Sequence, residues 1–171
     1  MKTEQGQMKM EFRGDTEVVL TRYFAAPRQL VFDCHTKPEL MRRWLIGPGE
    51  FTLEICELDL KAGGNYLYVF ADAKGNKAGV YGKFREVIVP EKLTNTENYA
   101  MDMSVFDPSH EDPNAMVESR TFAAQGNGTL LTHVCKYASA EIRKMTIESG
   151  AGPDGLAVSY VELDKLVQEI G

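Results

Sequence analysis

Glu97 is the first candidate for proton transfer in this sequence. It falls in a run of strand-forming residues, 92–100, where alternation places it on one face with Tyr99. A carboxyl group that faces an apolar interior has a raised pKa and can act as a general acid or base. The alternative is that this face meets solvent, because Thr94 and Thr96 make the opposite face equally typical of a strand.

Histidine is the other candidate for acid–base chemistry, and the sequence has three histidines. His133 falls in the middle of a predicted strand, on one face with Leu131 and Cys135. The alternatives for it are a proton-transfer role and a structural one with its ring nitrogens hydrogen bonded. His35 favours a structural role on a short helix, and His110 lies in an acidic loop without metal-ligand spacing. We therefore predict no metal site.

Arg120 is the candidate for binding an anionic group. Glu118 precedes it by two residues, so both side chains lie on one face of the predicted strand 115–124, together with Phe122. If this face points inward, the guanidinium can hold a ligand carboxylate. The alternative is a solvated pair of charges on the outer face.

The sequence lacks the usual motifs of cofactor binding and of reactive cysteines. No glycine-rich nucleotide loop and no nucleophile motif occurs, so we predict no cofactor. Cys34, Cys56 and Cys135 lack the CxxC spacing and stand in apolar surroundings, which favours inert reduced thiols.

Composition indicates a globular protein with one domain. The 171 residues, 43% of them hydrophobic, suffice for a single core, predicted over 16–171 after a flexible segment, 1–15. The net charge of −6 and the scattered basic residues argue against nucleic acid as a partner. No apolar run approaches the ~20 residues of a membrane span, and no signal sequence is recognised, so we expect a cytoplasmic protein.

The amino-terminal part predicts one strand and two short helices. Residues 17–24 are β-branched and aromatic without a breaker, which indicates a strand. Pro27 suits the first turn of a helix, and Pro38 ends that helix and begins a second one, which closes at Trp44.

The middle of the chain predicts an antiparallel meander. Turn-forming residues recur between alternating runs, as in Gly75-Asn76 and Asn127-Gly128, and these are hairpin signals. With the first strand they give about seven strands, the others being 50–60, 65–72, 79–89, 92–100, 115–124 and 129–138. Residues 101–114 contain two prolines and predict a long loop over one end of the sheet.

The carboxyl-terminal part predicts a long amphipathic helix. Ser139 begins a first helical run that is interrupted at 150–153. Beyond it, apolar residues recur at helical spacing at Leu156, Tyr160, Leu163, Val167 and Ile170. The concave face of the meander is the surface large enough to cover this stripe.

The chain resembles the START-like, or Bet v 1-like, superfamily, and most closely the subfamily named after the activator of the heat-shock-protein-90 ATPase. The resemblance covers about residues 17–170, in family order. It rests on the ordered set Arg22-x-Phe24-x-Ala26-Pro27, Thr36-x-Pro38-Glu39 with Arg43-Trp44, Asp59-x-x-x-Gly63-Gly64, Gly82-x-Phe84-x-Glu86-Val87, Thr129-Leu130-Leu131-Thr132 and Ser149-Gly150 with Gly155.

The resemblance implies an α+β helix-grip fold, in which a curved antiparallel sheet wraps around the last helix and two short helices close one end. It implies an apolar cavity between sheet and helix and, as the leading function, binding of a small apolar or amphipathic molecule. Superfamily members also include cyclases and hydrolases, which would use Glu97 or His133 here, and co-chaperones, which would have a chaperone partner.

The expected ligand-binding residues follow from this fold and are Trp44, Tyr66, Tyr68, Phe70, Tyr99, Arg120, Met145, Leu156 and Tyr160. The alternative for the aromatic residues of strand 65–72 is packing against the last helix, and for Trp44 it is anchoring of the short helices. The opposite face of strand 65–72 is also apolar, so a homodimer that covers it is a further expectation.

Overall fold

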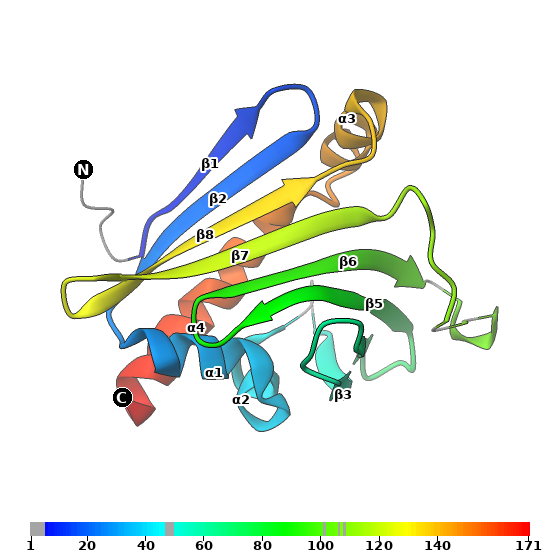
Figure 1. Ribbon diagram of the computed structural model, residues 1–171. Helices are drawn as coiled ribbons and strands as arrows, with labels where there is room; N and C mark the ends of the chain where they lie inside the picture. The colour runs from blue at the N-terminus through cyan, green and yellow to red at the C-terminus, as the bar shows by residue number, and fades with distance from the viewer. Residues whose placement is uncertain (1–5, 47–49, 101, 106, 108) are drawn as a thin grey trace.

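A computed structural model shows one curved antiparallel sheet with the last helix packed against its inner face (Figure 1). Two short helices lie at one end of this arrangement, next to the carboxyl-terminal half of the last helix (Figure 1). The structure describes residues 6–46, 50–100, 102–105, 107 and 109–171. No helix in these ranges is long and apolar enough to cross a lipid bilayer. The α+β helix-grip prediction is confirmed.

Within the described residues the sheet has eight strands, one more than the seven predicted. They are β1 Met8–Arg13, β2 Glu17–Phe24, β3 Thr52–Leu58, β4 Asn65–Ala71, β5 Lys77–Ile88, β6 Lys92–Ala100, β7 Met116–Gln125 and β8 Gly128–Lys136. Their order in the sheet is β1-β2-β8-β7-β6-β5-β4-β3, with every neighbouring pair antiparallel. Apart from β1, each strand lies within two residues of its predicted bounds.

The additional strand β1 falls in the segment 1–15, which the sequence predicted to be flexible. The structure pairs Met8–Arg13 with β2 along its whole length, so this part of the segment is ordered. Residues 1–5 lie outside the described residues. The strand lies at the edge of the sheet, and its charged residues alternate with Met8, Met10 and Phe12. Because edge strands carry many charged side chains, their sequences are similar to those of flexible, solvent-exposed segments.

The helices begin and end where the prolines and glycines of the sequence indicate. They are α1 Arg28–Thr36, α2 Pro38–Trp44, α3 Ala140–Glu148 and α4 Leu156–Ile170. Ser139 caps α3 by accepting a hydrogen bond from the backbone N–H of Ile142 at 3.1 Å. The predicted interruption follows, since Gly150 has a φ of +80°, which glycine adopts without steric cost.

The main core lies between the inner face of the sheet and α4. Tyr160, Leu163 and Val167 are buried against it, as the helical stripe predicted, whereas Leu156 is half-buried and Ile170 is exposed. Phe24 of β2 meets the Tyr160 ring edge-on, with ring centres 5.5 Å apart. The aromatic side chains therefore join the helix to the sheet.

A buried ion pair connects the same two elements. Arg22 of β2 donates two hydrogen bonds to the carboxylate of Asp164 on α4, at 2.8 and 2.7 Å. The Arg22 side chain is 2% exposed and that of Asp164 is 15% exposed. This two-bond geometry fixes the rotation of α4 about its axis as well as its distance from the sheet.

The outer face of β4 and β5 is covered in part by the chain itself. Val69 is buried on this face and pairs with Gly79 of β5. A Cβ atom added to Gly79 would lie 3.0 Å from the sulfur of Met103, in the 3₁₀ helix Met103–Val105 of the predicted long loop. The apolar outer face was the reason for expecting a homodimer. The loop that contains Met103 covers part of this face within the same chain.

Candidate functional site

Polar side chains gather on the inner face of β6, β7 and β8, opposite α4. The register places Asn95, Glu118 and Cys135 in one row across these strands, and Arg120 beside His133 in the next row. These side chains point inward because they share their faces with buried Leu93, Phe122 and Leu131. The strands thus bring together residues 40 positions apart in sequence.

A hydrogen-bond network joins these side chains, and we call Tyr66, Asn95, Glu118, Arg120 and His133 the inner polar cluster. Asn95 Nδ2 donates to Glu118 Oε1 at 2.8 Å and lies 3.1 Å from the Tyr66 hydroxyl. Arg120 Nη2 donates to Asn95 Oδ1 at 3.1 Å. His133 Nε2 lies 2.7 Å from Glu118 Oε2, and Asn95 therefore connects both charged residues of β7 to β4.

Glu118 is ionised in this cluster. Burial opposes its charge, but Arg120 and the hydrogen bond from His133 outweigh it and lower the pKa of Glu118 to about 2. An ionised carboxylate only accepts hydrogen bonds, so His133 Nε2 carries the proton that they share. The cluster therefore holds one buried carboxylate between a guanidinium and an imidazole.

Glu97 lies at the edge of this cluster, one step nearer the strand end. Burial and then the charge of Glu118 raise the pKa of Glu97 to about 8, so this carboxyl is largely protonated at neutral pH. The Tyr99 hydroxyl donates to Glu97 Oε2 at 3.1 Å, although Tyr99 itself is 60% exposed. Both residues line a hollow of about 220 Å³ that also touches Met116 and Tyr137.

Three buried nitrogens within the described part of the chain have no hydrogen-bond partner. They are Arg120 Nε, His133 Nδ1 and, on α1, His35 Nε2. His35 Nδ1 lies 2.7 Å from the backbone oxygen of Val31, and its ring contacts the Phe122 ring at 5.1 Å. Buried polar atoms are rarely left unpaired, so each such atom is a point where a ligand can add a hydrogen bond.

Aromatic side chains surround the inner polar cluster. Tyr66 and Tyr68 are buried with ring centres 4.9 Å apart, and Phe70 packs against the same core. From the helical side, Trp44 stacks on Tyr160 with ring centres 5.9 Å apart. The surroundings are therefore apolar on the sheet and on the helices alike.

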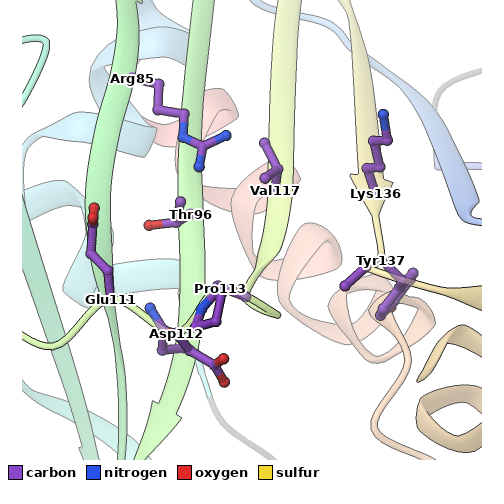
Figure 2. Close-up of a pocket in the computed structure, with 11 residues that line it drawn as sticks. Arg85, Thr96, Glu111, Asp112, Pro113, Val117, Lys136 and Tyr137 are labelled. Carbon is purple, nitrogen blue, oxygen red and sulfur yellow. The ribbon is translucent and has the colours of Figure 1, made fainter.

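A second hollow, of about 450 Å³, lies on the outer face of the sheet, away from α4. Figure 2 shows Arg85, Thr96, Val117 and Lys136 projecting from four neighbouring strands on this face. Acidic residues of the loop 111–113 border it, and no residue predicted for ligand binding lines it. The outer hollow is thus separate from the inner polar cluster.

The comparison with protein families identifies the chain. The profile of the family described as activator of Hsp90 ATPase homolog 1-like protein matches residues 25–168. The chain belongs to this family. The match covers the short helices, the sheet from β3 onward and almost all of α4, which confirms the resemblance recognised in the sequence.

Solved structures of bacterial proteins share the fold of this family member. A protein from Rhodobacter sphaeroides is 21% identical with a TM-score of 0.82, and the match covers 96% of this chain and all of that one. Protein Ms6760 from Mycobacterium smegmatis is 23% identical with a TM-score of 0.81, over 96% and 100% of the two chains. CalU16 from Micromonospora echinospora is 18% identical with a TM-score of 0.51, over 95% and 94%. A comparison with curated proteins gives no match.

The predicted site residues divide between the interior and the surface of this family member. Residues in or against the main core are Trp44, Tyr66, Tyr68, Phe70, Leu156 and Tyr160. Arg120 and His133 belong to the inner polar cluster, and Glu97 lies at its edge. Tyr99 is mostly exposed, and Met145 is 62% exposed on α3, which has no buried residue.

Sequence reasoning did not select Asn95 as a site residue, and it assigned His35 a structural role. Asn95 shares the inner face with Leu93 and Glu97, so its alternation with them was the available signal. His35 lies on α1, four residues after Val31, and both are buried. This helical spacing was the available signal that His35 is on the buried face of α1. Neither residue belongs to a motif with known chemistry, which is why both were left aside.

His35 predicts a defined dependence of stability on pH. Burial and then the nearby charge of Arg120 lower the pKa of His35 to about 3, and His133 and Glu118 are the other titratable groups that face it. An unfolded histidine binds its proton near pH 6.5. Between these values the unfolded state therefore binds more protons, so the contribution of His35 to stability falls as the pH falls.

We expect the stability advantage of wild type over a His35→Gln variant to fall by about 1.5–2 kcal/mol between pH 6.5 and 5. The measurement compares wild type with the variant because Glu97 also titrates in this pH range. Its raised pKa makes its own contribution to stability increase as the pH falls, and this contribution cancels in the comparison. Urea unfolding at each pH measures it, with the exposed His110→Gln as the control. A constant difference between wild type and His35→Gln would contradict a neutral His35.

Proposed function

We propose that this protein binds a small amphipathic molecule between the inner face of the sheet and α4. The apolar part of the ligand lies against the aromatic side chains, and its polar part accepts hydrogen bonds from the inner polar cluster. The observation that supports this most directly is the set of unpaired buried nitrogens of His35, Arg120 and His133. The ring of His35 also contacts the rings of Trp44 and Phe122.

The charge of Arg120 indicates which polar group fits best. Arg120 Nη2 binds Asn95, while its Nε has no partner among the described residues, so the guanidinium retains a free donor. Nearby Glu118 is already engaged by His133 and Asn95. An anionic or strongly accepting ligand group would therefore meet Arg120 on its unpaired side.

The aromatic side chains would supply most of the affinity. Burial of apolar ligand surface against Tyr68, Phe70 and Tyr160 contributes about 25 cal/mol per Å², less the cost of ordering the ligand. In this family member the packing of sheet against helix brings such rings together, as with Phe24 and Tyr160. Ligand entry requires the helical layer and the sheet to separate locally.

Two dyes test the proposal and separate its apolar part from its polar part. Anilinonaphthalene sulfonate carries an aromatic body and an anionic group, whereas phenylnaphthylamine carries a similar body without the charge. We expect Arg120→Met to weaken binding of the sulfonate about tenfold, because a hydrogen bond to a charged group is lost. Binding of the neutral dye should change less than about twofold. Dye fluorescence titrations measure both.

The controls use residues outside the interior. Arg43→Met removes an exposed cation that pairs with Glu169, and it should leave both affinities unchanged. Tyr68→Ala should weaken both dyes, since it removes apolar contact rather than charge. Unchanged affinity in Tyr68→Ala would place the ligand elsewhere, and equal loss of both dyes in Arg120→Met would contradict the polar assignment.

Acid–base catalysis is a second candidate function, favoured by Glu97. Its pKa of about 8 suits proton transfer near neutral pH, and it borders the hollow of about 220 Å³. His133 is the other proton carrier of the interior, held by Glu118. In a substrate screen with enolisable or hydrolysable aromatic compounds, Glu97→Gln should abolish turnover while leaving dye binding intact.

Two further partners follow from the sequence and the family alone. One is a chaperone and the other is a second copy of this chain, and we propose that either binds to the outer face of the sheet. Light scattering over a concentration series tests the homodimer, and copurification with the chaperone of the same organism tests the other partner.

A further inference from the structure

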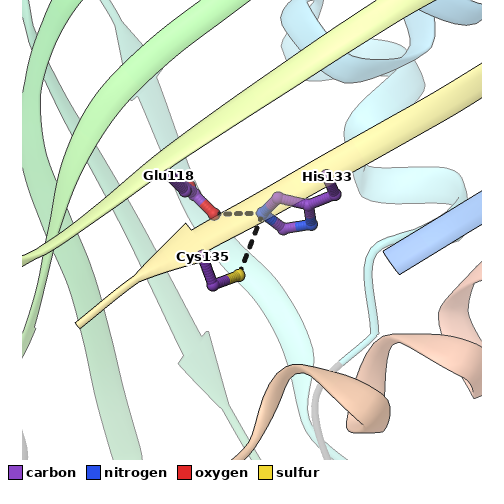
Figure 3. A group of neighbouring side chains, drawn as sticks. All are labelled: Glu118, His133 and Cys135. Atoms are coloured by element: carbon purple, nitrogen blue, oxygen red, sulfur yellow. Dashed lines mark hydrogen bonds and ion pairs between the residues drawn. The ribbon is translucent and has the colours of Figure 1, made fainter. Parts of the chain in front are cut away.

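Three side chains of different chemistry converge on the inner face of β7 and β8. Figure 3 shows the Glu118 carboxylate and the Cys135 thiol both directed at His133 Nε2. Glu118 Oε2 lies 2.7 Å and Cys135 Sγ lies 3.5 Å from that nitrogen. All three donor atoms lie within 4.8 Å of one another, and all three residues are buried.

These are the ligand types that zinc prefers. Zn²⁺ binds thiolate sulfur at about 2.3 Å and imidazole nitrogen or carboxylate oxygen at about 2.0–2.2 Å in tetrahedral geometry. From these bond lengths, neighbouring ligand atoms around the ion lie about 3.3–3.7 Å apart. The spacing from Cys135 to His133 already has this value, and the spacing from Glu118 to His133 must widen by about 0.6–1 Å.

We propose that Glu118, His133 and Cys135 form a binding site for a divalent transition metal of the zinc type. The proposal goes beyond the ligand-binding function above, although Glu118 and His133 also belong to the inner polar cluster, and it contrasts with the sequence-based expectation of no metal. Three protein ligands leave a fourth position for water or for an exogenous ligand, which is the arrangement of zinc sites that take part in chemistry.

The surroundings already hold the carboxylate in the required orientation. Asn95 binds Glu118 Oε1 at 2.8 Å, and Arg120 Nη2 lies 4.0 Å from the same oxygen. The second oxygen, Oε2, is thereby left to face His133. Outer hydrogen bonds of this kind orient metal-binding carboxylates, so Asn95 would act as a positioning residue.

The charges of the interior match a divalent ion. When Cys135 binds as a thiolate, it and Glu118 supply two negative charges to balance the ion. Arg120 adds one positive charge, 4.0 Å from Glu118 Oε1, and this charge offsets part of the attraction between the ligands and the ion.

A hollow of the protein surface borders the residues that pack around Cys135. Cys135 packs in a small cluster with Tyr137, Met116 and Ile142, and these three residues also line the hollow of about 220 Å³. Glu97 lines the same hollow.

Cobalt and zinc titrations of the reduced, chelator-treated protein test the proposal. We expect one Co²⁺ per chain, with d–d absorption typical of a tetrahedral site and a thiolate-to-cobalt charge-transfer band. Zn²⁺ should displace the cobalt with the same stoichiometry, and elemental analysis checks it. A wild-type spectrum with no thiolate band would overturn the proposal, whatever the variants show.

Variants locate the site. Loss of a residue that supports a metal ligand already lowers the metal affinity 10–100-fold. Loss of a ligand should cost more, so we expect Cys135→Ala to lower the zinc affinity by more than about 100-fold and to remove the charge-transfer band. Glu118→Gln should lower the zinc affinity but retain the charge-transfer band, because the thiolate remains. Asn95→Ala should lower the zinc affinity about 10–100-fold.

Matched controls separate this site from others. Cys56→Ala removes a second buried thiol, which lies beside the Met41 sulfur rather than beside His133, and His110→Ala removes an exposed histidine. Both should bind cobalt as wild type does, and circular dichroism verifies that each variant is folded. Loss of the band in Cys56→Ala with retention in Cys135→Ala would place the metal elsewhere and overturn the assignment.

Discussion

Replacing Asp164 with alanine is expected to destabilise the protein by about 3–5 kcal/mol. Asp164 accepts two hydrogen bonds from Arg22, whose side chain is 2% exposed. Removal of the carboxylate leaves a buried guanidinium without its counter-charge, and that penalty exceeds the attraction lost. Urea unfolding followed by circular dichroism measures the change.

The same helix offers a matched control for this experiment. Glu169 of α4 pairs with Arg43 of α2 at 2.7 Å, the same distance as in the buried pair. Its side chains are 43% and 66% exposed, so water solvates either charge when the other is removed. We therefore expect Glu169→Ala to cost less than about 1 kcal/mol.

A double variant distinguishes the charge from the packing. Arg22→Met with Asp164→Leu removes both charges and keeps apolar volume, so it should recover most of the stability lost in Asp164→Ala. If Asp164→Ala and Glu169→Ala cost the same, burial of Arg22 would not be the cause of the effect.

Trp44→Ala is expected to cost about 3–5 kcal/mol as well. The indole is buried at the end of α2, stacks on Tyr160 of α4 and lies 4.9 Å from the His35 ring on α1. Its Nε1 also donates to the backbone oxygen of Cys34 at 2.7 Å. Truncation therefore opens a cavity where three helices meet and leaves a carbonyl unpaired.

Circular dichroism is the measurement for this variant too, because Trp44 is the single tryptophan and its fluorescence is lost. Trp44→Phe should cost about 1–2 kcal/mol, since a ring remains while the hydrogen bond does not. Phe12→Ala on the exposed edge strand β1 should cost less than about 1 kcal/mol. A small effect in Trp44→Ala would contradict its role as the anchor of the helical layer.

The order of the elements and most of their bounds followed from the sequence. Pro27 and Pro38 restrict the backbone locally, and Gly150 permits a positive φ that other residues avoid, so all three marked helix boundaries without reference to the rest of the chain. The turns of the meander were equally local. Strand β1 was missed because its order depends on pairing with β2, and pairing is a long-range property that its own charged residues conceal.

The inner faces of the strands could not be chosen from the sequence. On β6 both faces are polar, since Leu93, Asn95 and Glu97 alternate with Thr94 and Thr96. The buried face is decided by α4 and by neighbouring strands, which place Phe122 and Leu131 on the same side. Hence Arg120 and His133 were recognised as candidates, but their meeting with Asn95 was not.

The pairing of Arg22 with Asp164 also bears on how the chain is made. The two residues are 142 positions apart, and Tyr160, Leu163 and Val167 complete the core from the last helix. A chain emerging from the ribosome therefore displays the bare concave sheet, with its aromatic rings and an unneutralised guanidinium, until α4 has also been made. The domain completes its fold only after α4 has left the ribosome, and chains that still lack α4 are the form most exposed to aggregation.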